Sequence, residues 1–152
     1  MENIEIEKYL IYNKQNKILI FHGNNKNKII LPTLYLNTDI RNYNQLTQRI
    51  LEYIENSLYF KTIEKVFLTT VLGDNNKLTK ENKKVKKHYF ACYHDFTLEE
   101  ELEIYNMALK EKLIPEFLDI DEILNNKLDI NISKYNVEAL NHLEKKLTYK
   151  MF

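Results

Sequence analysis

The sequence predicts an α+β domain with a mixed or antiparallel β-sheet, and three observations lead to this prediction. Segments rich in β-branched and aromatic residues, typical of strands, dominate the first two thirds of the chain. One amphipathic helix interrupts them, since Leu46, Ile50, Ile54 and Leu58 recur at steps of four residues and share one helix face. Helical segments then close the chain, an order that favours helices packed on a sheet.

Length and composition indicate one globular domain over residues 1–152. The chain is 44% hydrophobic and 29% charged, which is ordinary for a folded protein. The formal net charge is zero, so we expect no nucleic-acid partner and no membrane surface. The single cysteine, Cys92, excludes an internal disulfide and a cysteine-rich zinc site. An acidic N-terminus and the lack of a long apolar run favour a cytoplasmic protein.

The first half of the chain contains a predicted hairpin and the helix already described. Strands are expected at residues 5–12, 17–22 and 28–31. Pro32 cannot donate a hydrogen bond to a neighbouring strand, so the third strand should end or bulge there. A loop over 33–41 then leads to the amphipathic helix, which begins at Asn42 or Asn44 and ends at Ser57.

The second half contains two further strands, at 62–73 and 85–96, followed by helices. Thr97 with Glu100 three residues later is the pattern of a capping box, and Pro115 should mark the end of the helix that it opens. A short strand then leads into a short helix capped at Asp119 or Asp121. The last helix, at 131–147, carries one apolar side formed by Val137, Leu140, Leu143 and Leu147.

Basic and aromatic residues come together where the strand at 85–96 begins. Lysines crowd residues 77–87, and Tyr89 follows Lys87 closely. This combination is one way in which proteins hold nucleotides, so Lys87 and Tyr89 are candidate ligand-binding residues; a solvated hairpin loop is the other interpretation. His88, Cys92 and His94 alternate onto one face of the same strand, but they form no complete zinc site.

The order of these segments resembles a Nudix (MutT-like) domain over most of the chain, from about Tyr9 to Leu147. A hairpin precedes Leu31-Pro32, a polar loop follows, and the helix at 44–58 comes next. Later, the segment IPEFLDIDEIL places the aromatic Phe117 before a short acidic-capped helix. The resemblance implies a Nudix-like α/β/α sandwich with a mixed sheet. It also implies a box helix whose glutamates hold divalent cations against a diphosphate.

Most of the family box, GX5EX7REUXEEXGU, is altered in this chain, and two registers are possible. Counting from Pro32 without a gap buries Ile50 and Ile54 consistently, and we prefer this register. It puts Gln48 at the box arginine, Arg49 and Tyr53 at the first and last helix glutamates, and keeps only Glu52. The other register keeps Arg49 as the arginine but places Ile50, Tyr53 and Ile54 at the three carboxylate positions of the box helix. Few carboxylates make a poor Mg²⁺ site.

The resemblance therefore implies two functions of different classes. The first is a domain that binds a nucleotide or nucleoside-diphosphate-type ligand, with metal-dependent hydrolysis weak, altered or lost. In it, Glu52 is the catalytic residue and a Mg²⁺ ligand together with Glu55, and Arg49 contacts phosphate. Tyr53 contacts the ligand by stacking or through its hydroxyl, and Tyr35 is a candidate to stack on a base. The second is a catalytically inactive, self-associating interaction module, which includes a possible homodimer. A third interpretation, an unrelated α+β domain, predicts a sheet order unlike that of the Nudix sandwich.

Overall fold

The computed structural model describes residues 4–23, 29–36, 65–74, 84–125 and 134–150. Its strands are β1 (Ile4–Tyr12), β2 (Lys17–His22), β3 (Thr33–Tyr35), β4 (Val66–Asp74), β5 (Lys84–Tyr93) and β6 (Ile114–Asp119). Its helices are α2 (Leu98–Lys110), α3 (Ile120–Leu124) and α4 (Lys134–Lys150). The predicted box helix at 44–58 lies outside the described residues. No helix in the described ranges is long and apolar enough to span a membrane.

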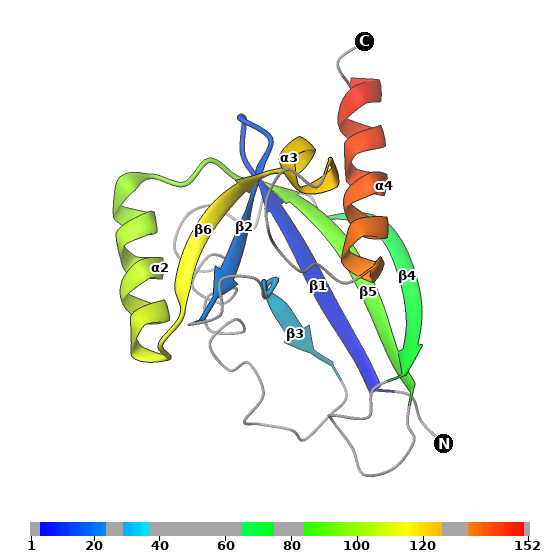
Figure 1. Cartoon of the computed structure of the whole chain (residues 1–152), viewed down its shortest axis with the longest axis horizontal. Coiled ribbons are helices and arrows are strands. Elements are labelled where there is room, and N and C mark those ends of the chain that lie inside the picture. Colours follow the sequence, from blue (N-terminus) through cyan, green and yellow to red (C-terminus); the bar gives the residue numbers. More distant parts are fainter. Residues whose placement is uncertain (1–3, 24–28, 37–64, 75–83, 126–133, 151–152) are drawn as a thin grey trace.

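The strands form one mixed sheet, as the sequence predicts (Figure 1). The order is β4-β5-β1-β2-β6, and β3 pairs with β1 outside this path. β1 and β5 are parallel, whereas the other neighbouring pairs are antiparallel. A parallel pair needs a long crossover connection, and the chain between β1 and β5 supplies it. β6 pairs only with β2 among the described strands and so forms an edge of the sheet.

The predicted strand at 28–31 is wrong, because the described part of it contributes a single bridge between Ile30 and Phe21. The true strand, β3, begins after Pro32 and pairs with the first half of β1. Pro32 lacks an N–H, but its carbonyl accepts a 2.9 Å hydrogen bond from the Tyr9 amide. The Thr33 hydroxyl donates to the Leu31 carbonyl at 2.8 Å. Pro32 therefore marks the point where the chain stops forming hydrogen bonds with β2 and begins to pair with β1.

Helices cover both faces of the sheet, which gives the α/β/α arrangement. Successive strand residues point to opposite faces, so β1 and β2 supply both cores. Helices α3 and α4 lie over one face (Figure 1). That core contains Leu10, Ile18, Ile20, Leu31, Leu68, Val71, Tyr89, Ala91, Ile120, Ile123, Ala139, Leu140 and Leu143. Helix α2 packs on the other face, where the core contains Tyr9, Ile11, Leu19, Phe21, Cys92, Ile104 and Ala108.

The capping box that the sequence predicts is present at the start of α2. The Thr97 hydroxyl accepts from the Glu100 amide at 3.2 Å, and the Glu100 carboxylate accepts from the Thr97 amide at 2.9 Å. The helix ends at Lys110, earlier than Pro115 suggests. Lys112 adopts a left-handed φ of 59°, and the Leu113 amide donates to the Ala108 carbonyl. This turn sends the chain directly into β6, so Pro115 lies within an edge strand.

The predicted hairpin, the strands at 62–73 and 85–96 and the later helices are confirmed over their described residues, with shifts of their ends. The loop predicted at 33–41 is wrong at its start, where β3 lies. β6 leads straight into α3, whose N-cap is Asp119: its carboxylate accepts from the Glu122 amide at 3.2 Å. In α4, Leu140 and Leu143 are buried against the sheet, and Val137 and Leu147 are half-buried beside them. Their common side is the apolar face expected from the sequence.

Candidate functional site

The described residues include some of the predicted site and leave out the rest. Arg49, Glu52, Tyr53 and Glu55 lie outside the described residues, so their roles stay predictions. Tyr35 ends β3, where its backbone is aligned with Ile6 of β1. Lys87 and Tyr89 are both described, and the candidate site is built around them.

Lys87 and Tyr89 lie on the same face of the sheet, and β1 adds Lys8 to them. The register aligns Ile6 with Lys87 and Lys8 with Tyr89 along the parallel pair of β1 and β5. Aligned residues on neighbouring strands project from the same face of a sheet. This is the face under α4, because the Tyr89 hydroxyl reaches Asn136 in that helix. We call Lys8, Lys87, Tyr89 and Asn136 the lysine site.

Both lysines of this site have lowered pKa values. Burial lowers the pKa of Lys8, and the nearby charge of Lys87 lowers it further, to about 8. Burial also lowers the pKa of Lys87. The Lys8 side chain makes no hydrogen bond or ion pair with another described residue. An anion placed beside these amines would be attracted by both, and its binding would raise their pKa values.

Within the lysine site, Tyr89 and Asn136 connect β5 to α4. The Tyr89 side chain is 0% exposed, and its hydroxyl donates to the Asn136 carbonyl oxygen at 2.7 Å. A role for Tyr89 in binding stays a prediction, and its burial leaves no open ring face for a base. Asn136 also is buried. The pair therefore fixes the position of the first turns of α4 over the sheet.

Replacing Tyr89 with phenylalanine tests this anchor. The variant removes the Tyr89 donor from the buried Asn136 oxygen, and we expect a loss of about 1–2 kcal/mol in the free energy of unfolding. Urea denaturation measures it. Tyr93→Phe is the matched control: the Tyr93 hydroxyl donates to Asp95 at 2.6 Å, but on the exposed surface. Equal losses in the two variants would contradict an anchoring role for the buried hydrogen bond.

Lys8 and Asn136 were missed at the sequence level, and only Lys8 leaves a signal there. On β1 the residues Ile6, Lys8 and Leu10 project from one face, so a lysine interrupts an otherwise apolar row. A lysine at such a position loses part of its hydration, so it needs either a neighbouring anion or a route for its amine to the solvent. Asn136 lies on a helix far along the chain from its partner, and no local pattern marks it.

Acidic groups near the β5–α2 connection have structural partners. Asp95 accepts from the Tyr93 hydroxyl and from the Lys14 amide, and these hydrogen bonds lower the pKa of its carboxyl group. Glu100 accepts from the Thr97 amide and contacts His94 Nε2 at 2.8 Å. Within the described ranges, no three His, Cys, Asp or Glu side chains form a group that could hold a metal ion.

The three residues at 88, 92 and 94 do not form one site. His88 bridges two strands, with Nδ1 2.9 Å from the Thr70 hydroxyl and Nε2 3.3 Å from Glu5. Cys92 is buried in the core under α2. β5 ends at Tyr93, so His94 lies beyond the strand. Each residue has its own surroundings, and the predicted alternation holds only for His88 and Cys92.

Comparisons of the sequence with protein-family models and with curated proteins find no match. The structure, in contrast, is similar to many solved structures. A mutT/nudix family protein from Listeria innocua is 10% identical and has a TM-score of 0.56 over 99% of this chain and 98% of that one. A NUDIX hydrolase from Nitrosomonas europaea is 12% identical, with a TM-score of 0.54 over 95% of this chain and 90% of that one.

A third similar structure is the NUDIX domain of Shewanella oneidensis NrtR in complex with ADP ribose. It is 10% identical, with a TM-score of 0.54 over 97% of this chain and 90% of that one. These similarities extend over nearly the whole chain and include a mixed sheet between helices. The chain therefore has a Nudix-like fold, which confirms the family resemblance at the level of structure. The sheet order unlike the Nudix sandwich, which the third interpretation predicts, is not observed.

Proposed function

We propose that this Nudix-like domain binds a nucleotide or nucleoside-diphosphate-type ligand, with the lysine site receiving its anionic part. The carrying observation is the pair Lys8 and Lys87, two amines on neighbouring strands whose pKa values are lowered. Phosphate oxygens would relieve the repulsion between the two charges. The NrtR domain in complex with ADP ribose supports this class of ligand for the fold.

The proposal assigns further roles to residues of the box segment. Arg49 contacts phosphate, and Tyr53 or Tyr35 stacks on the base. Glu52, with Glu55, holds a divalent cation such as Mg²⁺, which polarises a phosphoryl oxygen when bound. Because Glu52 alone remains of the box carboxylates, we expect diphosphate hydrolysis to be weak, altered or lost.

A panel of nucleotides and dinucleotides, including ADP ribose, tests this proposal by thermal shift with and without magnesium. We expect at least one ligand to raise the melting temperature of the wild-type protein. The shift should disappear in Lys8→Met, because the anion then loses one of its two cations. It should persist in Lys145→Met, which removes an exposed lysine of α4.

Glu52→Gln separates binding from metal chemistry in the same panel. A shift that needs magnesium in the wild type and loses this dependence in Glu52→Gln supports a remnant cation site. A shift that is indifferent to both supports a binding pocket without hydrolysis. If no ligand stabilises the wild type, the proposal of a nucleotide-binding domain is wrong.

A further inference from the structure

Helix α2 presents an apolar stripe to the solvent. Its inner face is buried on the sheet through Glu100, Ile104 and Ala108. Its outer face carries large apolar side chains that are strongly exposed. These are Leu98, Leu102, Tyr105 and Leu109, with exposed fractions of 72%, 55%, 43% and 48%. We call these four residues the outer stripe of α2. An apolar row of this length is more than the scattered single residues that are normal on a surface.

The spacing of the outer stripe is that of a helix–helix contact. The steps along it are four, three and four residues, the a/d repeat that gives one helix a straight seam against another. The inner face already fixes α2 to its own domain, so this seam has no partner within the described part of the chain. The pattern indicates that the outer stripe is adapted to another helix.

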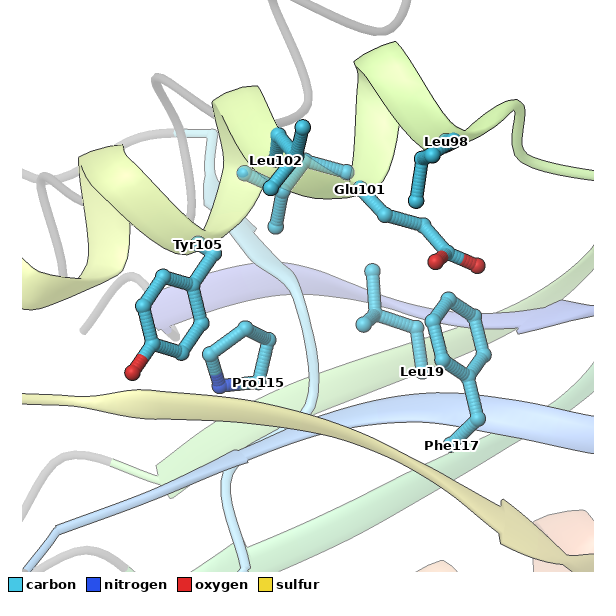
Figure 2. Close-up of a pocket in the computed structure, with 8 residues that line it drawn as sticks. Leu19, Leu98, Glu101, Leu102, Tyr105, Pro115 and Phe117 are labelled. Atoms are coloured by element: carbon cyan, nitrogen blue, oxygen red, sulfur yellow. The ribbon is translucent and has the colours of Figure 1, made fainter.

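A groove extends the apolar surface from the outer stripe to the sheet edge. Figure 2 shows Leu98, Leu102 and Tyr105 along one wall, with Pro115 and Phe117 of β6 opposite them. The cavity has a volume of about 250 Å³. Because β6 is an edge strand and α2 lies beside it at one end of the molecule, both are open to an approaching protein (Figure 1).

The charges beside the outer stripe are arranged with opposite signs at its two ends. A second row lies beside the outer stripe, and each of its members directly follows one stripe residue in the sequence. Its members are Glu99, Glu103, Asn106 and Lys110. All four are exposed. The row is acidic toward the N-terminus of α2 and basic at its C-terminal end. A second copy of the same helix is complementary to this row only when the two helices run antiparallel.

We propose that α2 is a homodimer interface, in which α2 of one copy packs antiparallel on α2 of a second copy about a two-fold axis. The outer stripe is symmetric about its own midpoint. Leu98 then packs against the partner's Leu109, and Leu102 packs against the partner's Tyr105. Such self-complementarity is what a two-fold interface requires, because both copies contribute the same patch.

Electrostatics selects the antiparallel arrangement over the parallel one. In the antiparallel pair, Glu99 lies close to the partner's Lys110 on the same flank of the interface. In a parallel pair, the acidic ends of both helices would meet, and their dipoles would be aligned side by side in the same direction. The groove beside the outer stripe gives the partner's leucine side chains further apolar surface to contact.

Sedimentation velocity of the full chain over a range of concentrations tests the interface. We expect a monomer–dimer equilibrium in the wild type, and Leu102→Gln should raise its dissociation constant by about tenfold or more. Leu72→Gln is the matched control, since Leu72 is 50% exposed but lies on β4. An unchanged dissociation constant in Leu102→Gln, or a wild type that is monomeric at every concentration, would overturn the proposal.

A charge exchange and a cross-link test the antiparallel direction. Lys110→Glu should weaken the dimer, and adding Glu99→Lys should restore it, because each lysine again meets a carboxylate. Under oxidation, a mixture of Leu102→Cys and Tyr105→Cys chains should form more covalent dimer than either variant alone. The native Cys92 is buried and does not compete. Preferential cross-linking within each single variant would instead show a parallel contact and overturn the arrangement.

Discussion

Replacing Lys8 with methionine is expected to raise the free energy of unfolding at pH 7 by up to about 3 kcal/mol. The folded chain holds the pKa of this lysine at about 8, against 10.5 for the free side chain. Each pKa unit corresponds to about 1.4 kcal/mol. The whole shift therefore destabilises the folded state by up to about 3 kcal/mol when Lys8 is charged. Methionine has a similar unbranched shape and removes the charge.

The effect of Lys8→Met on the free energy of unfolding should depend on pH. A lysine whose pKa is lowered by folding binds fewer protons in the folded state than in the unfolded state. Its contribution to stability therefore rises as the pH increases from about 8 to 10.5. The advantage of Lys8→Met should be largest at pH 7 and should shrink through this window. Urea denaturation of both proteins at several pH values measures it.

An exposed lysine provides the control for Lys8. Lys145→Met should change stability by less than about 0.5 kcal/mol at every pH. A Lys8→Met protein that is no more stable than the wild type at pH 7 would contradict the lowered pKa of this side chain. If the variant is more stable but no longer binds the ligand found in the nucleotide panel, Lys8 is retained for binding at the expense of stability.

Local chemistry predicted much of the fold. The capping box at Thr97 and Glu100, and the N-cap at Asp119, are confirmed because each depends on residues three positions apart. The strand predicted before Pro32 is wrong although the segment is apolar enough for a strand. Ile30 makes a single bridge to Phe21 of β2, and already at Pro32 the next hydrogen bond goes to Tyr9 of β1. Which strands become neighbours depends on packing between distant segments, and a single sequence does not record it.

In the candidate site, too, residues close in sequence were predicted together, whereas residues distant in sequence were not. The occurrence of basic residues beside aromatic ones at the start of β5 was sufficient to group Lys87 with Tyr89. Lys8 joins them only through the parallel pairing of β1 with β5, and Asn136 only through the docking of α4. A lysine in an apolar row is a signal that sequence reasoning can use, whereas a helix asparagine carries none.

The second large effect is expected at Glu100, whose replacement by alanine should cost about 3 kcal/mol in the free energy of unfolding. This carboxylate is 2% exposed and has two partners. One oxygen accepts from the Thr97 amide and completes the capping box, and the other lies 2.8 Å from His94 Nε2. Alanine would remove both interactions and leave the Thr97 amide and the His94 imidazole without these acceptors.

Two variants separate the terms that make up this loss. Thr97→Ala removes only the side-chain half of the box and should cost about 1 kcal/mol. Glu101→Ala changes an exposed carboxylate on the same helix turn and should stay within about 0.5 kcal/mol of the wild type. Equal stabilities for Glu100→Ala and Glu101→Ala would contradict the assignment. A large difference would show that Glu100 fixes the start of α2, and with it the direction in which the outer stripe faces.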